Sequence, residues 1–175
     1  MKIIIVVGLV RSGKDTVSEY ISRAYGYQLL VASDVIREEA KKRGITPSKE
    51  NLTKLTEELY ENGFQGEIAR RLMKRFSSDR VVINGFRSPV QIDFLRNEYN
   101  GDVYVLEVFS RSDLRFARRE NDDPQNEEKF FERDKIDIEK FALNKVLEMA
   151  DYRVNNNGSK EELYKQIDEF MKEIE

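Results

Sequence analysis

Residues 2–15, KIIIVVGLVRSGKD, are the stretch that decides the fold. The apolar run Ile3–Val7 is too short to span a bilayer and predicts a buried strand. Residues 8–14 then follow the spacing G-x-x-x-x-G-K, and a helical pattern begins at Gly13. In this context glycines let the backbone curl so that its N–H groups point at phosphate oxygens, and the helix directs its positive end at the same oxygens. The stretch therefore predicts a phosphate-binding loop in which Lys14 adds a positive charge at a transferring phosphate.

Apolar runs alternate with amphipathic segments along the rest of the chain. Strands are predicted at residues 2–7, 27–32, 80–84, 102–109 and 151–155. Helices are predicted at residues 13–25, 33–43, 47–62, 64–76, 111–119, 126–149 and 159–174. Ser33 is the expected cap of the helix at 33–43, and a further helix is expected to begin at Pro89 behind the cap Ser88. This alternation indicates an α/β fold with a parallel sheet and helices on both faces, built as a single domain of residues 1–175.

The composition excludes several kinds of chemistry. The chain has no cysteine and no histidine, which rules out disulfides, Cys/His zinc sites and catalysis by either residue. Acid–base work would fall to Asp, Glu, Lys or Tyr. The net charge of −3 gives no bulk attraction to nucleic acid or to an anionic membrane, so we expect neither as a partner. The lack of cysteine is compatible with a cytoplasm, where we expect the protein, and the oligomeric state stays open.

The loop departs from the usual pattern at Asp15, which stands where Ser or Thr normally ligates magnesium. Thr16 follows, but one residue further along a helix points about 100° away. A carboxylate beside phosphates repels them unless a cation lies between, so we predict that Asp15 holds Mg²⁺, directly or through water. The sequence SGKD resembles the phosphate loops of animal phosphomevalonate kinase and of phage-type deoxynucleotide kinases. The residues predicted to bind ATP are Gly8, Arg11, Ser12, Gly13, Lys14, Asp15, Thr16 and Asn156.

The acceptor side resembles the nucleoside monophosphate kinases, the adenylate kinase group in particular. Residues 33–37, SDVIR, carry an acidic residue followed three positions later by an arginine, so the resemblance gives Asp34 and Arg37 to the acceptor site. Residues 84–87, NGFR, resemble the family's Asp-Gly-Phe-Pro-Arg without its proline, which makes Arg87 a second clamp on the acceptor phosphate. Gln91 matches the glutamine that reads the acceptor base.

Asn84 is a second departure from that family, which has Asp at this position to hold the magnesium shell. The chain has lost a carboxylate at Asn84 and gained one at Asp15. We interpret the two changes as compensating, because either arrangement leaves one anionic group beside the metal. Both residues are therefore predicted metal ligands.

The charged segment of residues 110–140, called the lid below, resembles the family's mobile lid. Arg115, Arg118 and Arg133 are its predicted catalytic residues, since arginines that close over the transferred group stabilise its charge. Arg111 and Arg119 are also present in the lid. Each of these arginines is equally compatible with a surface salt bridge.

The segment Ala150–Ser159 resembles the end of dephospho-coenzyme A kinases and of an uncharacterised archaeal family of adenylate-kinase-related proteins. In these proteins the loop borders the donor adenine, which places Asn156 in the donor site. An Asn/Gly turn before a capped helix explains the same residues. The resemblance runs along nearly the whole chain and implies a three-layer α/β/α P-loop kinase fold. It implies a five-stranded parallel sheet of order 2-3-1-4-5, with acceptor-binding helices inserted at residues 34–76.

Three functions are compatible with these motifs. The first is transfer of the γ-phosphate of Mg-ATP to a nucleoside monophosphate, which needs no general base because the acceptor is already an anion. The second is a kinase for dephospho-coenzyme A or another hydroxyl acceptor, with Asp34 as the candidate base. The third is a non-catalytic nucleotide sensor, which the departures at Asp15 and Asn84 favour. A switch GTPase is disfavoured because the chain has no Asn-Lys-x-Asp motif.

Overall fold

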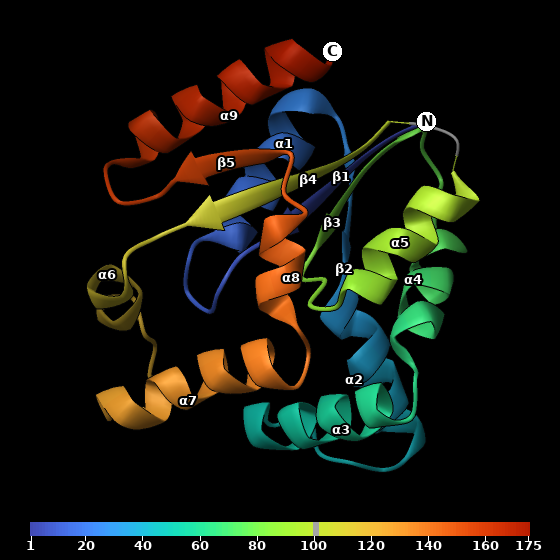
Figure 1. Cartoon of the computed structure of the whole chain (residues 1–175), viewed down its shortest axis with the longest axis vertical. Helices are drawn as coiled ribbons and strands as arrows, with labels where there is room; N and C mark the ends of the chain where they lie inside the picture. Colours follow the sequence, from blue (N-terminus) through green and yellow to red (C-terminus); the bar gives the residue numbers. More distant parts are fainter. Residues whose placement is uncertain (100–101) are drawn as a thin grey trace.

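The computed structural model describes residues 1–99 and 102–175, and its strands form one sheet (Figure 1). The strands are β1 (Lys2–Val7), β2 (Gln28–Val31), β3 (Arg80–Asn84), β4 (Asp102–Phe109) and β5 (Tyr152–Asn155). Their order is β2-β3-β1-β4-β5, and every neighbouring pair is parallel. The predicted parallel sheet of order 2-3-1-4-5 is therefore confirmed.

The helices fall close to the predicted ranges. They are α1 (Lys14–Tyr25), α2 (Ala32–Lys42), α3 (Lys49–Glu61), α4 (Gln65–Met73), α5 (Pro89–Glu98), α6 (Ser112–Ala117), α7 (Glu127–Glu139), α8 (Leu143–Glu148) and α9 (Lys160–Ile174). Among the described residues, none of these helices is long and apolar enough to cross a membrane.

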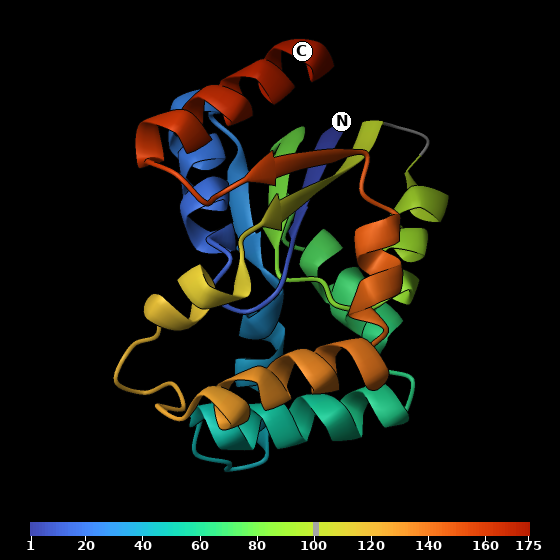
Figure 2. The same ribbon diagram turned by 60° about the vertical axis from the view of Figure 1, so that its left-hand side comes forward.

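The central strand β1 is apolar on both faces because helices cover both sides of the sheet. Ile3, Ile5 and Val7 belong to one buried cluster, together with residues of α2, α4, α5 and α8. Ile4 and Val6 belong to a second cluster, together with residues of α1 and α9. Figure 2 shows α1 and α9 on one side of the strands and α4, α5 and α8 on the other, which gives the predicted three layers.

Two predicted element ends are wrong. The cap of α2 is Val31 rather than Ser33, because β2 passes into the helix without an intervening loop. The helix predicted at 126–149 is interrupted between α7 and α8, where Ala142 has a φ of 60°. The interruption lets both Phe141 and Leu143 reach the core, and the Phe141 ring packs against Tyr60 with 4.5 Å between ring centroids.

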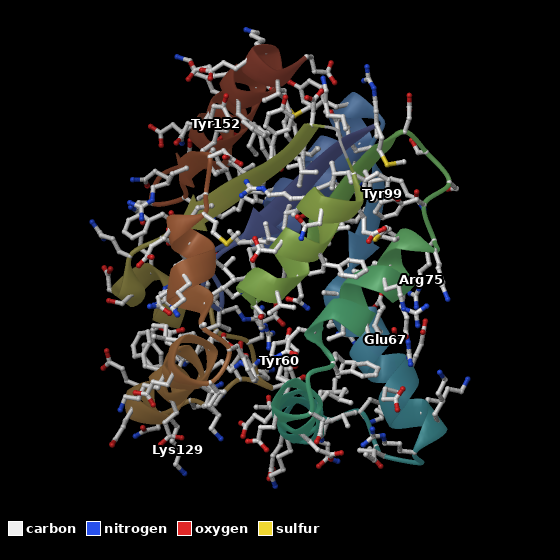
Figure 3. The ribbon with its side chains drawn as sticks, turned by 45° about the vertical axis from the view of Figure 1, so that its right-hand side comes forward. Tyr60, Glu67, Arg75, Tyr99, Lys129 and Tyr152 are labelled. Carbon is white, nitrogen blue, oxygen red and sulfur yellow. The ribbon has the colours of Figure 1, made fainter. Side chains whose placement is uncertain are left out.

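The carboxyl ends of β1, β3 and β4 lie at one edge of the sheet, and α3 and α7 lie side by side beyond that edge (Figure 2). Arg133 of α7 donates a hydrogen bond of 2.5 Å to Thr53 of α3. Lys140, directly after α7, lies 2.6 Å from Glu57 of the same helix α3. Figure 3 shows Tyr60, near the end of α3, at the junction with the segment of α7 and α8. The lid and the helices predicted to bind the acceptor therefore meet over the edge where parallel sheets commonly bind ligands.

The two-sided core gives a stability prediction. Ile5→Ala should lower the free energy of unfolding by about 2 to 5 kcal/mol, because the fully buried side chain leaves a cavity in the central strand. Val90→Ala is the control, since that side chain on α5 is 50% exposed and should change the value by less than about 0.5 kcal/mol. Urea denaturation measures both. Equal losses in the two variants would contradict this description of the core.

Candidate functional site

The loop that joins β1 to α1 is enclosed by backbone and side chains from the ends of other strands. A Cβ built on Gly8 would lie 2.6 Å from the Val108 carbonyl oxygen, and one built on Gly13 would lie 2.2 Å from Asn156 Nδ2. The Asn156 amide also donates a hydrogen bond of 2.8 Å to the Ser12 carbonyl oxygen. A side chain at Gly8 or Gly13 would collide with these neighbours, so the conformation of the loop requires glycine at both positions.

The interior of this loop has the features of a phosphate site. Gly13 is the N-cap of α1 and has no side chain to cap it, so the first N–H groups of the helix are available to an anion. Ser12 is buried, and its Oγ has no hydrogen-bond partner among the described residues. Lys14 Nζ donates to the Leu9 carbonyl oxygen at 2.8 Å, which curls the side chain back across the loop. Thr16 lies partly buried in the same first turn.

The charge of Lys14 is set by its surroundings. Burial and the nearby positive charge of Arg87 lower the pKa of Lys14 to about 8, whereas the carboxylates of Asp137 and Asp15 oppose the shift. A phosphate group beside Lys14 would reverse the balance, because an opposite charge favours the protonated form. Binding of an anion would therefore stabilise the charged form of Lys14.

The two predicted metal ligands lie together although they are far apart in the sequence. Asn84 Nδ2, at the buried end of β3, donates a hydrogen bond of 2.6 Å to Asp15 Oδ1 at the start of α1. A carboxylate and an amide oxygen are hard donors that fit Mg²⁺. Among the described residues, no cluster of three acidic side chains gathers to make a metal cage. A magnesium ion bound here would complete its shell with water and substrate phosphates.

The first two lid arginines contact the donor side of the site. Arg115 is buried, pairs with Asp134 through bonds of 3.1 and 2.8 Å, and also donates to the Val10 carbonyl oxygen in the loop. Arg118 donates to the Asn156 carbonyl oxygen at 2.7 Å. Asn156 therefore joins the lid to the phosphate loop. Arg111 and Arg119 contact lid residues instead: Arg111 pairs with Asp113, and Arg119 lies over the Phe116 ring.

Arg11 points away from the loop interior toward the tip of the lid. Its guanidinium contacts Asp123 at 2.6 and 2.7 Å and Glu120 at 3.1 Å. Asp123 is nearly buried and also accepts a hydrogen bond of 2.7 Å from Lys49 in the acceptor region. One carboxylate therefore ties together the loop, the lid and α3. Sequence analysis did not identify Asp123, because residues 121–124 have only the signature of a polar loop.

On the acceptor side, Asp34 and Arg37 pair with each other at 2.9 Å in α2, and both side chains are 52% exposed. Ser33 also accepts a hydrogen bond from Arg37. The pair is accessible to a ligand. The predicted spacing thus places the two residues on one helix face, as expected for positions three apart.

Gln91 caps the start of α5. Its Oε1 accepts hydrogen bonds from the backbone N–H groups of Arg87 at 2.9 Å and Ser88 at 3.1 Å, and the residue is fully buried. It is the distal member of a capping box with Ser88 at the start of α5. Its Nε2 has no hydrogen-bond partner among the described residues, so the predicted contact with an acceptor base stays a prediction, and capping α5 is an additional role. The spacing S-x-x-Q in residues 88–91 is the signal from which this role was predictable.

Asp137 is the functional candidate that sequence analysis missed. It lies in α7, one helical turn after Arg133, and its Oδ1 lies 3.2 Å from Arg133 Nε and 3.6 Å from Arg87 Nη1. Burial raises the pKa of Asp137, and the charges of Arg87 and Lys14 oppose the shift. Arg87 and Arg133, predicted from separate motifs, are therefore brought together around one carboxylate. The spacing of four between Arg133 and Asp137 was the available sequence signal.

Comparison with known proteins shows the family to which the chain belongs. Residues 7–139 match the protein family described as an AAA domain. A UPF0200/UPF0201 protein of Archaeoglobus fulgidus is 32% identical over 98% of this chain, which spans only 55% of that relative's length. A UPF0200 protein of Thermococcus onnurineus is 32% identical over 98% of this chain and 97% of the relative.

The fold is also similar to that of solved kinases. Shikimate kinase from Acinetobacter baumannii in complex with shikimate superposes with a TM-score of 0.64 and covers 99% of this chain and 93% of its own. The two sequences are 21% identical, so the likeness shows a shared fold alone. The P-loop kinase fold predicted from the sequence is confirmed.

The position of Lys14 gives a prediction about its titration. In the ligand-free protein the Lys14 ammonium should lose its proton near pH 8, well below the value of about 10.4 for an ordinary lysine. Addition of ATP should raise this midpoint, so affinity for ATP should fall as the pH rises through 8. The ¹³Cε chemical shift, assigned with Lys14→Ala, follows the titration. A titration midpoint that equals that of an ordinary lysine and does not change on addition of ATP would contradict the burial of this group.

The close contact at Gly13 gives a second prediction. Gly13→Ala and Gly26→Ala alter opposite ends of α1, and both glycines have positive φ, so each should destabilise the fold by at least about 1 kcal/mol. Only the Cβ at position 13 meets Asn156, whereas a Cβ at Gly26 meets nothing within 4 Å. Gly13→Ala alone should weaken ATP binding, as measured by calorimetry. Equal ATP affinity in the two variants would show that the loop does not bind the nucleotide.

Proposed function

The chain belongs to the UPF0200 family and to the AAA domain family, and on this premise we propose that it is an ATP-dependent phosphotransferase. The proposed reaction moves the γ-phosphate of ATP to the phosphate of a nucleoside monophosphate. The observation that carries the proposal is the convergence of Arg87 and Arg133, from two separate elements, on Asp137 beside Lys14. A curled loop with a lysine suits the donor phosphates, and the two arginines suit a second phosphate in line with them.

The proposed chemistry depends on position and charge. The loop amides, Ser12 and Lys14 would hold the donor phosphates. Arg87, with Arg37 at the outer end, would hold the acceptor phosphate, which is already an anion and needs no general base. Arg115 would stabilise the charge that builds on the transferred group, because it already contacts the loop at Val10. Asp15 and Asn84 would hold Mg²⁺, whose charge supports the transfer.

Contacts between the lid and α3 support a closed arrangement. Thr53 and Glu57, one helical turn apart on α3, contact Arg133 and Lys140. A closed lid excludes water that would otherwise accept the phosphoryl group. The ion pairs that join the lid to α3 include Lys140–Glu57 and Lys49–Asp123, and their lysine side chains are about half exposed, so opening the lid would cost little stability.

A hydroxyl acceptor such as dephospho-coenzyme A is the second candidate. Asp34 is accessible at the acceptor side and lies within a hydrogen bond of Arg37, so it could serve as a base for such an acceptor. The third candidate is a nucleotide sensor without turnover. It is favoured by the hydrogen bond that links Asn84 to Asp15 and occupies the side chains proposed for the metal.

An ADP-formation assay tests the proposal. The protein is incubated with Mg-ATP and a panel of nucleoside monophosphates plus dephospho-coenzyme A. One monophosphate should give rapid ADP release, and Lys14→Ala should lower the rate by at least about 100-fold, since it removes a charge at the transition state. Lys145→Ala, an exposed lysine on α8, is the matched control with the same change in charge.

Three outcomes separate the candidates. Turnover with a monophosphate that Lys14→Ala abolishes and Lys145→Ala preserves supports the proposal. Turnover with dephospho-coenzyme A alone supports the hydroxyl acceptor. Tight binding of ATP without turnover above the Lys14→Ala background means that the protein is a sensor and that the proposed reaction is wrong.

A further inference from the structure

We propose that the Asp137 carboxylate occupies the position of the acceptor's phosphate in the ligand-free protein, and that the substrate binds by displacing it. This inference rests on the proposed function for the identity of the ligand, a phosphate monoester. It assigns Asp137 as a positioning residue that keeps Arg87 and Arg133 gathered before the substrate arrives.

The carboxylate sits among three cations from different elements. Arg133 precedes it by one turn of α7, Arg87 follows β3, and Lys14 begins α1. The Asp137 side chain is 5% exposed, so these charges interact in a medium where water screens them weakly. Tyr60 of α3 is also close enough for the Asp137 charge to influence it. No other negatively charged partner competes for Arg87 among the ion pairs of the described residues.

The geometry suits a larger anion better than it suits a carboxylate. Asp137 Oδ1 is buried, yet it forms no hydrogen bond of good geometry among the described residues, although two guanidinium groups lie within 3.6 Å. Each guanidinium presents a planar fork of donors that matches phosphate oxygens in pairs. A phosphate has three terminal oxygens and could complete both forks at once. The unsatisfied oxygen therefore indicates a site built for a different group.

The balance of charge points the same way. Lys14, Arg87 and Arg133 supply three positive charges, and once Asp137 is displaced the nearby Asp15 carboxylate offsets one of them, which leaves two. A phosphate monoester carries about −1.5 to −2 at neutral pH. The excess charge of the cluster therefore matches the charge of one such group.

Two other arginines also pair with carboxylates of the lid, in these cases through hydrogen bonds. Arg115 pairs with Asp134, and Arg11 pairs with Asp123. Asp134 and Asp123 both lie in the lid, as Asp137 does. The lid thus supplies a carboxylate to arginines that were each predicted to meet a phosphate, which is the arrangement expected of groups that stand in for the substrate.

Binding of inorganic phosphate and of AMP to the Asp137→Asn variant tests the inference directly. The variant keeps the shape of the side chain and removes its charge. Calorimetry should show both ligands binding about tenfold more tightly than to the wild type, because an internal competitor that occupies the site most of the time has been removed. Glu139→Gln, at an exposed position on the same helix with the same change in charge, should stay within about twofold of the wild type.

A double variant locates the bound phosphate. If the phosphate lies between the two arginines, Arg133→Gln added to Asp137→Asn should abolish the gain. A phosphate held only in the loop around Lys14 would keep its affinity in the double variant, which would overturn the inference. Unchanged or weaker phosphate affinity in folded Asp137→Asn would also overturn it, and would leave Asp137 as a proton acceptor or a purely structural group.

A measurement on the wild type covers the case in which Asp137→Asn does not fold. The ¹⁵Nε resonance of Arg133 should shift on addition of phosphate, while that of Arg23, an exposed arginine on α1, should not. An Arg133 ¹⁵Nε chemical shift that does not change on addition of phosphate would overturn the inference.

These readouts need no turnover, so the inference and the kinase proposal can fail separately. If no acceptor gives ADP but phosphate displaces Asp137, the anion site stands and the kinase proposal fails. If an acceptor gives ADP but the phosphate affinity of Asp137→Asn is unaltered, the kinase proposal stands and Asp137 does not occupy the phosphate position.

Discussion

The close approach of the phosphate loop to the neighbouring strand ends is the constraint on which the site depends. Gly8 lies against the Val108 carbonyl oxygen of β4, and Gly13 lies against the Asn156 amide that follows β5. The backbone between β1 and α1 therefore curls between these two contacts. Lys14 follows as the first residue of α1. The parallel order of the sheet then brings Asn84, at the end of β3, beside Asp15. The proposed donor and metal positions therefore follow from the topology of the central strands.

Ion pairs between the lid and the rest of the protein place the remaining charged groups. Lys49, Thr53 and Glu57 are spaced four residues apart and so share a face of α3. They contact the lid at its tip, along α7 and just after α7, respectively. Asp123 connects this contact to Arg11 in the loop. Charged side chains thus link the loop, the lid and α3.

The sequence was sufficient for the fold because the strands are continuous apolar runs and the loop motif has a strict spacing. The sheet order, the three layers and the pairing of Asp15 with Asn84 were all predictable from these patterns and from the family resemblance. Features that depend on tertiary contact were not. Ala142 interrupts a helical pattern because two neighbouring apolar side chains enter the core, and Gln91 serves a helix cap although its position resembles that of a base-reading residue.

The role of Asp137 was hidden for a related reason. In a segment rich in charged residues, sequence alone cannot tell a buried carboxylate from the exposed ones around it. Arg133 is a neighbour on the same helix, but only the packing of α7 near the strand ends buries Asp137 and brings Arg87 to it. The lid arginines were similarly ambiguous. Their side-chain partners separate Arg115 and Arg133, which contact the loop and Asp137, from Arg111 and Arg119, whose guanidinium groups contact Asp113 and Phe116 within the lid.

The most direct test of the central claim is a crystal structure with Mg²⁺ and a bisubstrate analogue, in which the phosphates of ATP and of a nucleoside monophosphate are joined in one chain. The claim predicts that the donor phosphates lie in the loop at Lys14. It also predicts that the acceptor phosphate lies between Arg87 and Arg133, with Asp137 turned away from both. An analogue whose phosphates lie outside the loop, or a structure in which Asp137 keeps its two arginines while the acceptor phosphate binds elsewhere, would contradict it.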